Sequence, residues 1–219
     1  MIETKKYELT SETLVLSGHT LHRIKALKDF GSIKAGELGG WIESEENLSQ
    51  ANNAWVYGDS KVYEDAKVYD DAVICGNARV RGNARVFDNA MVCGKANVFG
   101  NAWVYGNAEL LDDATVFGNA EIFGNAELCD NAMVYGLAKV GDKAEIGDKA
   151  TICDKAEIRG NAKIRDAADY IVFKDFWSNR RYFTWTRSNN KWNVGGFHGT
   201  GEELIKKAYA DSEISGREY

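Results

Sequence analysis

The sequence predicts an all-β solenoid, in which one short strand is repeated along a rod. Alanine occupies every sixth position from Ala54 to Ala162, and Ser60 is the exception. Two residues after each of these positions stands an aliphatic side chain, from Val56 to Ile164. Most hexads then end in Gly or Asp followed by Asn, Asp or Lys, which is typical of a turn. Self-similarity at a fixed short period indicates a repeat architecture.

Within one hexad, Ala-x-Val-x, successive side chains point to opposite sides of a strand. The alanine and the aliphatic residue therefore point inward, and the other two point outward. The Gly-Asn or Asp-Asp pair supplies a corner, since Gly and Asn adopt positive φ at low cost. An α-helix is excluded, because a period of six places no stripe at 3.6 residues per turn. The small interior side chains leave no ligand cavity, so we expect a structural core.

Residues 1–47 are expected to form an N-terminal β cap, because a bare solenoid exposes unpaired strand edges at its ends. Gly36–Ile42 is predicted to be a turn that leads into the first coil. Ile42 and Leu48 begin the apolar column, and the rod is predicted to span residues 48–167. The predicted strands of the cap are Tyr7–Leu9, Thr13–Leu16 and Leu21–Leu27.

Residues 144–149, Ala-Glu-Ile-Gly-Asp-Lys, resemble the hexapeptide repeat of left-handed β-helix proteins. Leu-Gly-Gly-Trp-Ile-Glu at 38–43, the Gly-Asn-Ala repeats and Gly-Phe-His-Gly-Thr at 196–200 also resemble a group of phage and prophage proteins. The resemblance implies a single-stranded, left-handed parallel β-helix with three hexads per coil, and it implies trimers. Eighteen residues per coil then give about six coils and a rod of roughly 30 Å.

Residues 168–219 are expected to form a small C-terminal α+β domain, since the hexad pattern stops after Ile164. Thr200 and Glu203 form a capping-box pattern that opens a helix over Leu204–Ala210. Three strands precede the helix, and we predict them at Tyr170–Phe173, Arg181–Thr186 and Lys191–Val194.

The composition argues against several classes of protein. The net charge of −6 argues against a nucleic-acid partner. The chain has no apolar run of about 18 residues, and its polar start lacks a signal-peptide core, so no membrane association is expected. The cysteines all lie in the repeat, where we expect reduced thiols that fill space in a cytoplasmic protein, or in the host cytoplasm of a phage-encoded one. These are Cys75, Cys93, Cys129 and Cys153.

Hexapeptide-repeat proteins include many acyltransferases, in which a histidine acts as general base in a cleft between subunits. Here the repeat holds no histidine, and His19, His22 and His198 lie in the end domains. A base cannot act from outside hydrogen-bond reach. We therefore predict a non-enzymatic binding or scaffolding protein with no catalytic residue, metal or cofactor. An acyl-CoA-dependent acyltransferase, with His198 in a C-terminal cleft, is one alternative.

A second alternative is an anti-defence protein that sequesters a nucleotide or another small signal molecule. At eighteen residues per coil, Arg81 lies between Tyr63 and Phe99, and such a group can stack a base and pair with a phosphate. A solvated cation–π ladder is the simpler interpretation of the same residues. A second candidate cluster lies in the C-terminal domain and comprises Arg180, Arg181, Trp185 and His198.

Outward aromatic residues also recur at eighteen-residue spacing and predict ladders along the rod. Such ladders stabilise a sheet, but this much apolar surface exceeds what a monomer usually exposes. We therefore predict a homo-oligomer, and the resemblance favours a trimer; a host protein is another possible partner. The predicted oligomer interface is Tyr69, Phe87, Tyr105 and Phe123.

Overall fold

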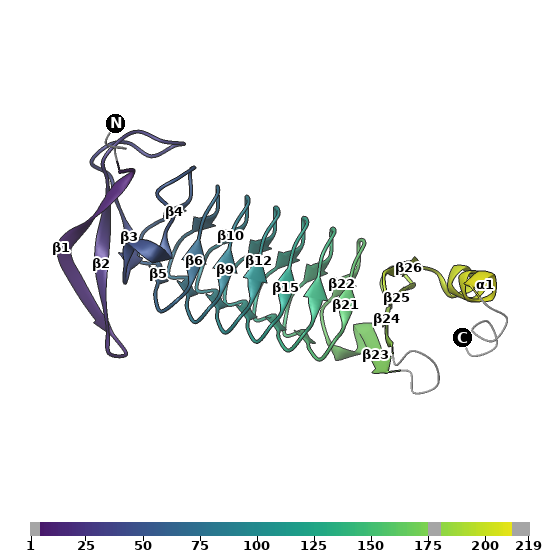
Figure 1. Cartoon of the computed structure of the whole chain (residues 1–219). Helices are drawn as coiled ribbons and strands as arrows, with labels where there is room; N and C mark the ends of the chain where they lie inside the picture. The colour runs from purple at the N-terminus through teal and green to yellow at the C-terminus, as the bar shows by residue number, and fades with distance from the viewer. Residues whose placement is uncertain (1–4, 175–180, 212–219) are drawn as a thin grey trace.

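The computed structural model describes residues 5–174 and 181–211, and it confirms the predicted fold class. The chain is a parallel β-solenoid of about seven turns. Figure 1 shows the coils stacked side by side as a rod, with a hairpin at the N-terminal end and a small sheet and one helix at the C-terminal end. No helix among the described residues is long and apolar enough to cross a membrane.

Three parallel sheets form the faces of the rod, and each strand inside the repeat is two residues long. Sheet A contains β3 (Leu38–Ile42), β5 (Lys61–Val62), β8 (Arg79–Val80), β11 (Asn97–Val98), β14 (Thr115–Val116), β17 (Met133–Val134) and β20 (Thr151–Ile152). Sheet B contains β6 (Lys67–Val68), β9 (Arg85–Val86), β12 (Trp103–Val104), β15 (Glu121–Ile122), β18 (Lys139–Val140) and β21 (Glu157–Ile158). Sheet C contains β4 (Trp55–Val56), β7 (Val73–Ile74), β10 (Met91–Val92), β13 (Glu109–Leu110), β16 (Glu127–Leu128), β19 (Glu145–Ile146) and β22 (Lys163–Ile164).

Each strand pairs in register with the strand one coil further on. Val104, for example, lies opposite Ile122, eighteen residues later. The coiling begins before the alanine repeat, because Ile42 pairs with Val62 and Leu48 bridges to Val68. This early start accounts for the additional turn beyond the six that the repeat alone predicts.

The interior is built as the alternation predicts. The alanines and aliphatic residues of the hexads are fully or almost fully buried along the rod. Ser60, the exception to the alanine pattern, is also buried, and its hydroxyl donates to the carbonyls of Tyr57 and Ile74. A hydroxyl in this apolar column is therefore tolerated because it is hydrogen-bonded.

The corners depend on a residue with positive φ at the fifth position of each hexad. This residue is Gly or an acidic side chain, such as Gly94 with φ of 69° or Asp130 with φ of 55°. Where it is Asp, the carboxylate commonly accepts a hydrogen bond from the backbone of the next coil, as Asp130 does from Asp148 N–H at 2.9 Å. The asparagines follow at the sixth position and form amide ladders, as predicted; Asn101 Nδ2, for example, donates to Asn119 at 3.2 Å.

A hairpin caps the N-terminal end. It pairs β1 (Tyr7–Leu16) with β2 (His19–Ala26), so the two strands predicted at its start are one strand with a register shift between Leu9 and Thr13. A 3₁₀ turn, η1 (Glu45–Asn47), follows β3. The packing of Tyr7 and Ile24 into the main core closes this end of the rod.

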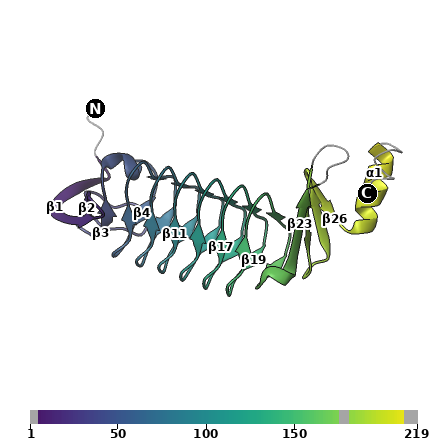
Figure 2. The ribbon, with the colours of Figure 1, turned by 90° about the horizontal axis from the view of Figure 1, so that it is seen from below.

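A second cap closes the C-terminal end (Figure 2). The Thr200 hydroxyl accepts from Glu203 N–H at 3.2 Å, while the Glu203 carboxylate accepts from Thr200 N–H at 2.7 Å, so the predicted capping box is present. The sequence did not predict the fourth strand, which is short and glycine-flanked. The elements of this cap are η2 (Ala167–Asp169), β23 (Tyr170–Lys174), β24 (Tyr182–Thr186), β25 (Lys191–Val194), β26 (Phe197–Gly199) and α1 (Gly201–Asp211).

Candidate active site

The C-terminal sheet has one apolar face and one polar face. Phe183, Val194 and Leu204 form a small apolar core on the face that α1 covers. The alternate residues Thr184 and Asn193 are buried on the opposite face. Because successive strand residues alternate, this second face is polar and lies toward the rod.

This polar face hydrogen-bonds to the end of the solenoid. Thr184 Oγ1 accepts from Glu157 N–H at 3.0 Å, and Ser188 Oγ accepts from Lys163 N–H at 2.7 Å. Asn189 Nδ2 donates to the Arg159 carbonyl at 3.4 Å. Side chains of the cap therefore satisfy backbone groups of the last coil that lack a further coil.

His198 lies at this junction. Its Nδ1 is 2.8 Å from Asn193 Oδ1, and Asn193 is only 1% exposed. An amide oxygen only accepts hydrogen bonds, so His198 Nδ1 is the donor in this pair; in the neutral imidazole with this tautomer, Nε2 is the nitrogen that carries the lone pair. Nε2 points at Gly160 on the last coil, where an added Cβ would lie 2.9 Å from it. The exposed imidazole is thus oriented by a buried amide, with its other nitrogen beside Gly160.

His19 has a different environment at the other end of the rod. Its Nδ1 lies 2.9 Å from a Glu43 oxygen, and its Nε2 lies 3.7 Å from a Glu64 oxygen. The hydrogen bond to Glu43, and then the charges of Glu43 and Glu64, raise the pKa of His19. An imidazole held between two carboxylates favours the protonated form, which has no lone pair to accept a proton.

The predicted nucleotide cluster is only partly assembled. The Arg81 guanidinium lies over the Phe99 ring at 4.3 Å. Tyr63, however, is 5% exposed and packs with Leu21 and Trp41 under the hairpin. A base therefore cannot enter between Tyr63 and Phe99, because the cap already covers the tyrosine.

The second predicted cluster does not converge on one site. Trp185 donates to Asn190 at 3.0 Å and lies opposite Trp192 on the neighbouring strand. In β24 it alternates with Thr184, so it lies on the opposite face from His198. Arg181 is exposed beside Gly195, and Arg180 lies outside the described residues.

The predicted aromatic ladder is present. Neighbouring rings of Tyr69, Phe87, Tyr105 and Phe123 are nearly parallel, at centroid distances of 4.9, 5.0 and 5.6 Å. Arg159 covers the end of the ladder, 5.0 Å from the Phe123 centroid. The stack therefore presents ring edges to solvent, which suits contact with another protein surface better than face-to-face binding of a sugar or base.

Two of the cysteines differ from the prediction of reduced thiols. Cys75 and Cys93 form a disulfide between consecutive coils. Their eighteen-residue spacing places them in register, with Cα atoms 4.5 Å apart, which is within disulfide range. Cys129 and Cys153 remain free. Burial raises the pKa of the Cys129 thiol, and the Asp130 hydrogen bond raises it further, so this thiol is not activated as a nucleophile.

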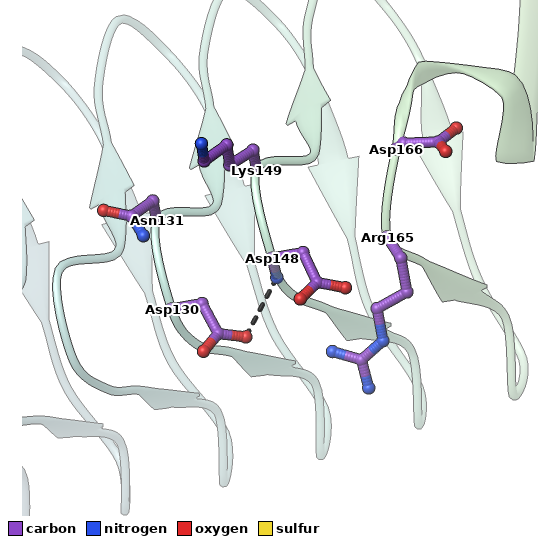
Figure 3. A pocket seen from close by; sticks show the side chains of 6 residues that line it. All are labelled: Asp130, Asn131, Asp148, Lys149, Arg165 and Asp166. Atoms are coloured by element: carbon purple, nitrogen blue, oxygen red, sulfur yellow. Dashed lines mark hydrogen bonds between the residues drawn. The ribbon is translucent and has the colours of Figure 1, made fainter.

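A shallow polar hollow of about 420 Å³ lies along one corner of the rod (Figure 3). Some of its charged groups are engaged locally: Asp130 accepts from Asp148 N–H, as Figure 3 shows, and Arg165 lies 3.6 Å from Glu145. Within residues 5–174 and 181–211, no group of three His, Cys, Asp or Glu side chains is placed to hold a metal ion. The hollow therefore offers no oriented base or nucleophile. Its lining residues are Asp130, Asn131, Asp148, Lys149, Arg165 and Asp166.

Comparison with known proteins changes the prediction of function. No family model matches the chain. It is 36% identical over 61 residues to the uncharacterized acetyltransferase YdcK of Escherichia coli (strain K12). The match covers 24% of this chain and 19% of that protein. The prediction of a non-enzymatic protein is therefore wrong, because this similarity points toward an enzyme family. Absence of histidine from the repeat was a poor criterion, since the cap brings a histidine to the rod's end.

Proposed function

We propose that the protein is an acyltransferase that uses acyl-CoA as donor and His198 as general base. The observation that carries this proposal is the His198–Asn193 pair, in which a buried amide orients an exposed imidazole so that its Nε2 faces Gly160 at the rod's end. The similarity to a protein named as an acetyltransferase supports an acetyl thioester as the donor. His19 is not the base, because its two nitrogens face carboxylates.

The reaction follows from that geometry. His198 Nε2 removes a proton from an acceptor hydroxyl or amine as the acceptor attacks the thioester carbonyl. The carbon–sulfur bond then breaks, and the CoA thiolate takes the proton back from the imidazolium. Asn193 holds the imidazole in the tautomer that this cycle requires, so it is a positioning residue.

Release of free CoA from acetyl-CoA measures the proposed activity. The assay uses the full chain with a panel of hydroxyl and amine acceptors, alongside direct calorimetric binding of acetyl-CoA. We expect His198→Ala to lower kcat by about 10²–10⁴-fold, which is typical for loss of a general base. His22→Ala is the matched control, since the His22 ring lies beside the Thr10 carbonyl in the hairpin at the other end of the rod, and it should retain activity.

Circular dichroism of His198→Ala separates loss of the base from loss of the fold. Absence of both acetyl-CoA binding and CoA release in the unaltered protein would contradict the proposal. If His198→Ala is as active as the unaltered chain, His198 is not the general base.

The enzyme is further proposed to be a homo-oligomer whose subunits meet partly through the Tyr69–Phe123 ladder. Half-buried rings with outward edges form a continuous apolar strip along the rod. Hexapeptide-repeat β-helices are commonly trimeric, which supports three subunits. The kinship with phage proteins and a role against host defence stay predictions.

A further inference from the structure

Five cations gather on the N-terminal coils of this acidic chain, and we call them the cationic patch. Lys61 lies directly opposite Arg79 on sheet A, and Lys67 lies directly opposite Arg85 on sheet B. Like charges at facing positions destabilise a sheet. Further along sheet B the same register holds opposite charges, as in the 2.9 Å pair of Lys139 and Glu121, whereas the register of sheet A continues with the uncharged Asn97 and Thr115. The patch consists of Lys61, Lys67, Arg79, Arg81 and Arg85.

None of the five cations forms an ion pair with a described acidic side chain. Glu64 is nearby, but its oxygens contact Gly82 N–H at 2.7 Å and His19 at 3.7 Å. The Lys61 ammonium donates only to a backbone carbonyl. On sheet C the outward register holds three carboxylates, those of Glu109, Glu127 and Glu145. The five cations are therefore not neutralised by direct ion pairs, although acidic side chains lie on the same coils, among them Asp59, whose charge acts on Lys61.

Two of the arginines are held in place by aromatic rings. Arg81 lies 4.3 Å from the centroid of Phe99, and Arg85 lies 5.3 Å from that of Trp103. A guanidinium stacked on a ring keeps its N–H groups free at the rim. Such a planar fork matches two oxygens of a phosphate group. The rings thus lower the entropy that the arginines would lose on binding an anion.

We propose that the cationic patch binds the phosphate groups of the acyl-CoA donor, an inference that rests on the proposed function. In sheet B the register leads from Arg85 through Trp103, Glu121 and Lys139 to Glu157. These four coil steps span roughly 19 Å at ~4.8 Å each.

Gly160, which His198 faces, lies three residues after Glu157, just past the end of β21. CoA carries its phosphates at one end and its thioester at the other, joined by an extended pantetheine arm. Phosphates on the patch therefore allow the arm to run along the rod toward His198. Because the cap covers Tyr63, recognition at this end depends on the phosphates rather than on base stacking.

Titration calorimetry with adenosine 3′,5′-bisphosphate tests the patch without requiring catalysis. Arg79 and Arg85 are exposed, so alanine substitution at either position leaves the core intact. We expect Arg79→Ala and Arg85→Ala each to weaken binding about tenfold, the effect of one charge-assisted hydrogen bond. Lys149→Ala, which removes an exposed charge on a distant coil, should leave the affinity unchanged. Equal effects of all three variants, or no binding at all, would overturn the proposal.

Acetyl-pantetheine, which lacks the nucleotide phosphates, separates this inference from the proposed function. The arginine variants should raise KM for acetyl-CoA about tenfold and leave kcat/KM for acetyl-pantetheine unchanged. If kcat/KM of the unaltered protein is identical for the two donors, the proposed phosphate site is wrong and the proposed acyltransferase activity stands. If the protein binds the bisphosphate but releases no thiol from either donor, the proposed phosphate site stands and the proposed acyltransferase activity is wrong.

Discussion

Lys6 provides a sharp test of how the N-terminal cap is held together. Its side chain is 1% exposed, and its ammonium donates to the carbonyls of Ala51, Asn52 and Ala54 at 3.2, 3.4 and 2.9 Å. Burial lowers the pKa of Lys6 from its ordinary value of 10.5 to about 8; Lys28 lowers it further and Asp71 partly offsets this. The protonated lysine thus links the cap to the first coil, although its charge is costly to bury.

The direction of the pH effect follows from proton binding in the two states. Between pH 8 and 10.5 the unfolded chain keeps the Lys6 proton that the folded chain has lost. The free energy of unfolding therefore rises with pH across this window. At about 1.4 kcal/mol per pH unit, the depressed pKa is worth at most about 3 kcal/mol. Below pH 8 both states are protonated, and the contribution is constant.

The comparison of the unaltered protein with Lys6→Met isolates this contribution, because other titrating groups cancel. Urea unfolding followed by circular dichroism at pH 7, 8, 9 and 10 gives the free energy of unfolding of each. We expect the free energy of unfolding of the unaltered protein, relative to that of the variant, to increase by roughly 2–3 kcal/mol between pH 7 and pH 10. A difference that stays constant over this range would refute the assignment of a depressed pKa to a buried Lys6.

Three further predictions test the rod. Val116→Asp should lower the free energy of unfolding by several kcal/mol, because it buries a charge. The same substitution at the outward neighbour, Thr115→Asp, should be tolerated. Thermal melting of the two variants compares them. Cys75→Ser should lower the stability of the oxidised protein by about 3 kcal/mol and have no effect under reduction, because it removes the link to Cys93. Phe87→Glu should shift light-scattering mass toward the monomer; an unchanged mass would show that the ladder is not the interface.

The fold could be predicted because the hexad determines it locally. Alanine and the aliphatic residue must both be interior, and Gly or Asp must form the corner, so one unit predicts the whole rod. The breaks in the pattern were harder to predict. Ile42 and Leu48 were predicted to begin the apolar column, but the extra turn was not counted because it lacks the alanine signal. The strand Phe197–Gly199 is too short and glycine-rich to show alternation.

For the candidate site, His198 could be named from the sequence as the base of one alternative, but its orientation could not be predicted, because it depends on contacts between distant segments. His198 acquires its orientation from Asn193 and its position from Gly160, thirty-eight residues earlier in the chain. The cover over Tyr63 similarly depends on how the hairpin folds back. The disulfide, in contrast, could have been predicted, since Cys75 and Cys93 are separated by one eighteen-residue coil.

If the rod sets the spacing between the cationic patch and His198, its length should determine which donor the enzyme prefers. Deletion of residues 108–125 removes one coil and joins Asn107 to Ala126, so the hexad pattern and both caps are preserved. The patch then lies about 4.8 Å closer to His198. We expect a folded rod by circular dichroism, a raised KM for acetyl-CoA, and unchanged kinetics with acetyl-pantetheine, which does not reach the patch. Unchanged kinetics with both donors would show that the cationic patch and His198 do not bind one and the same ligand. Loss of both activities in a folded rod would show that the deleted coil itself takes part in catalysis.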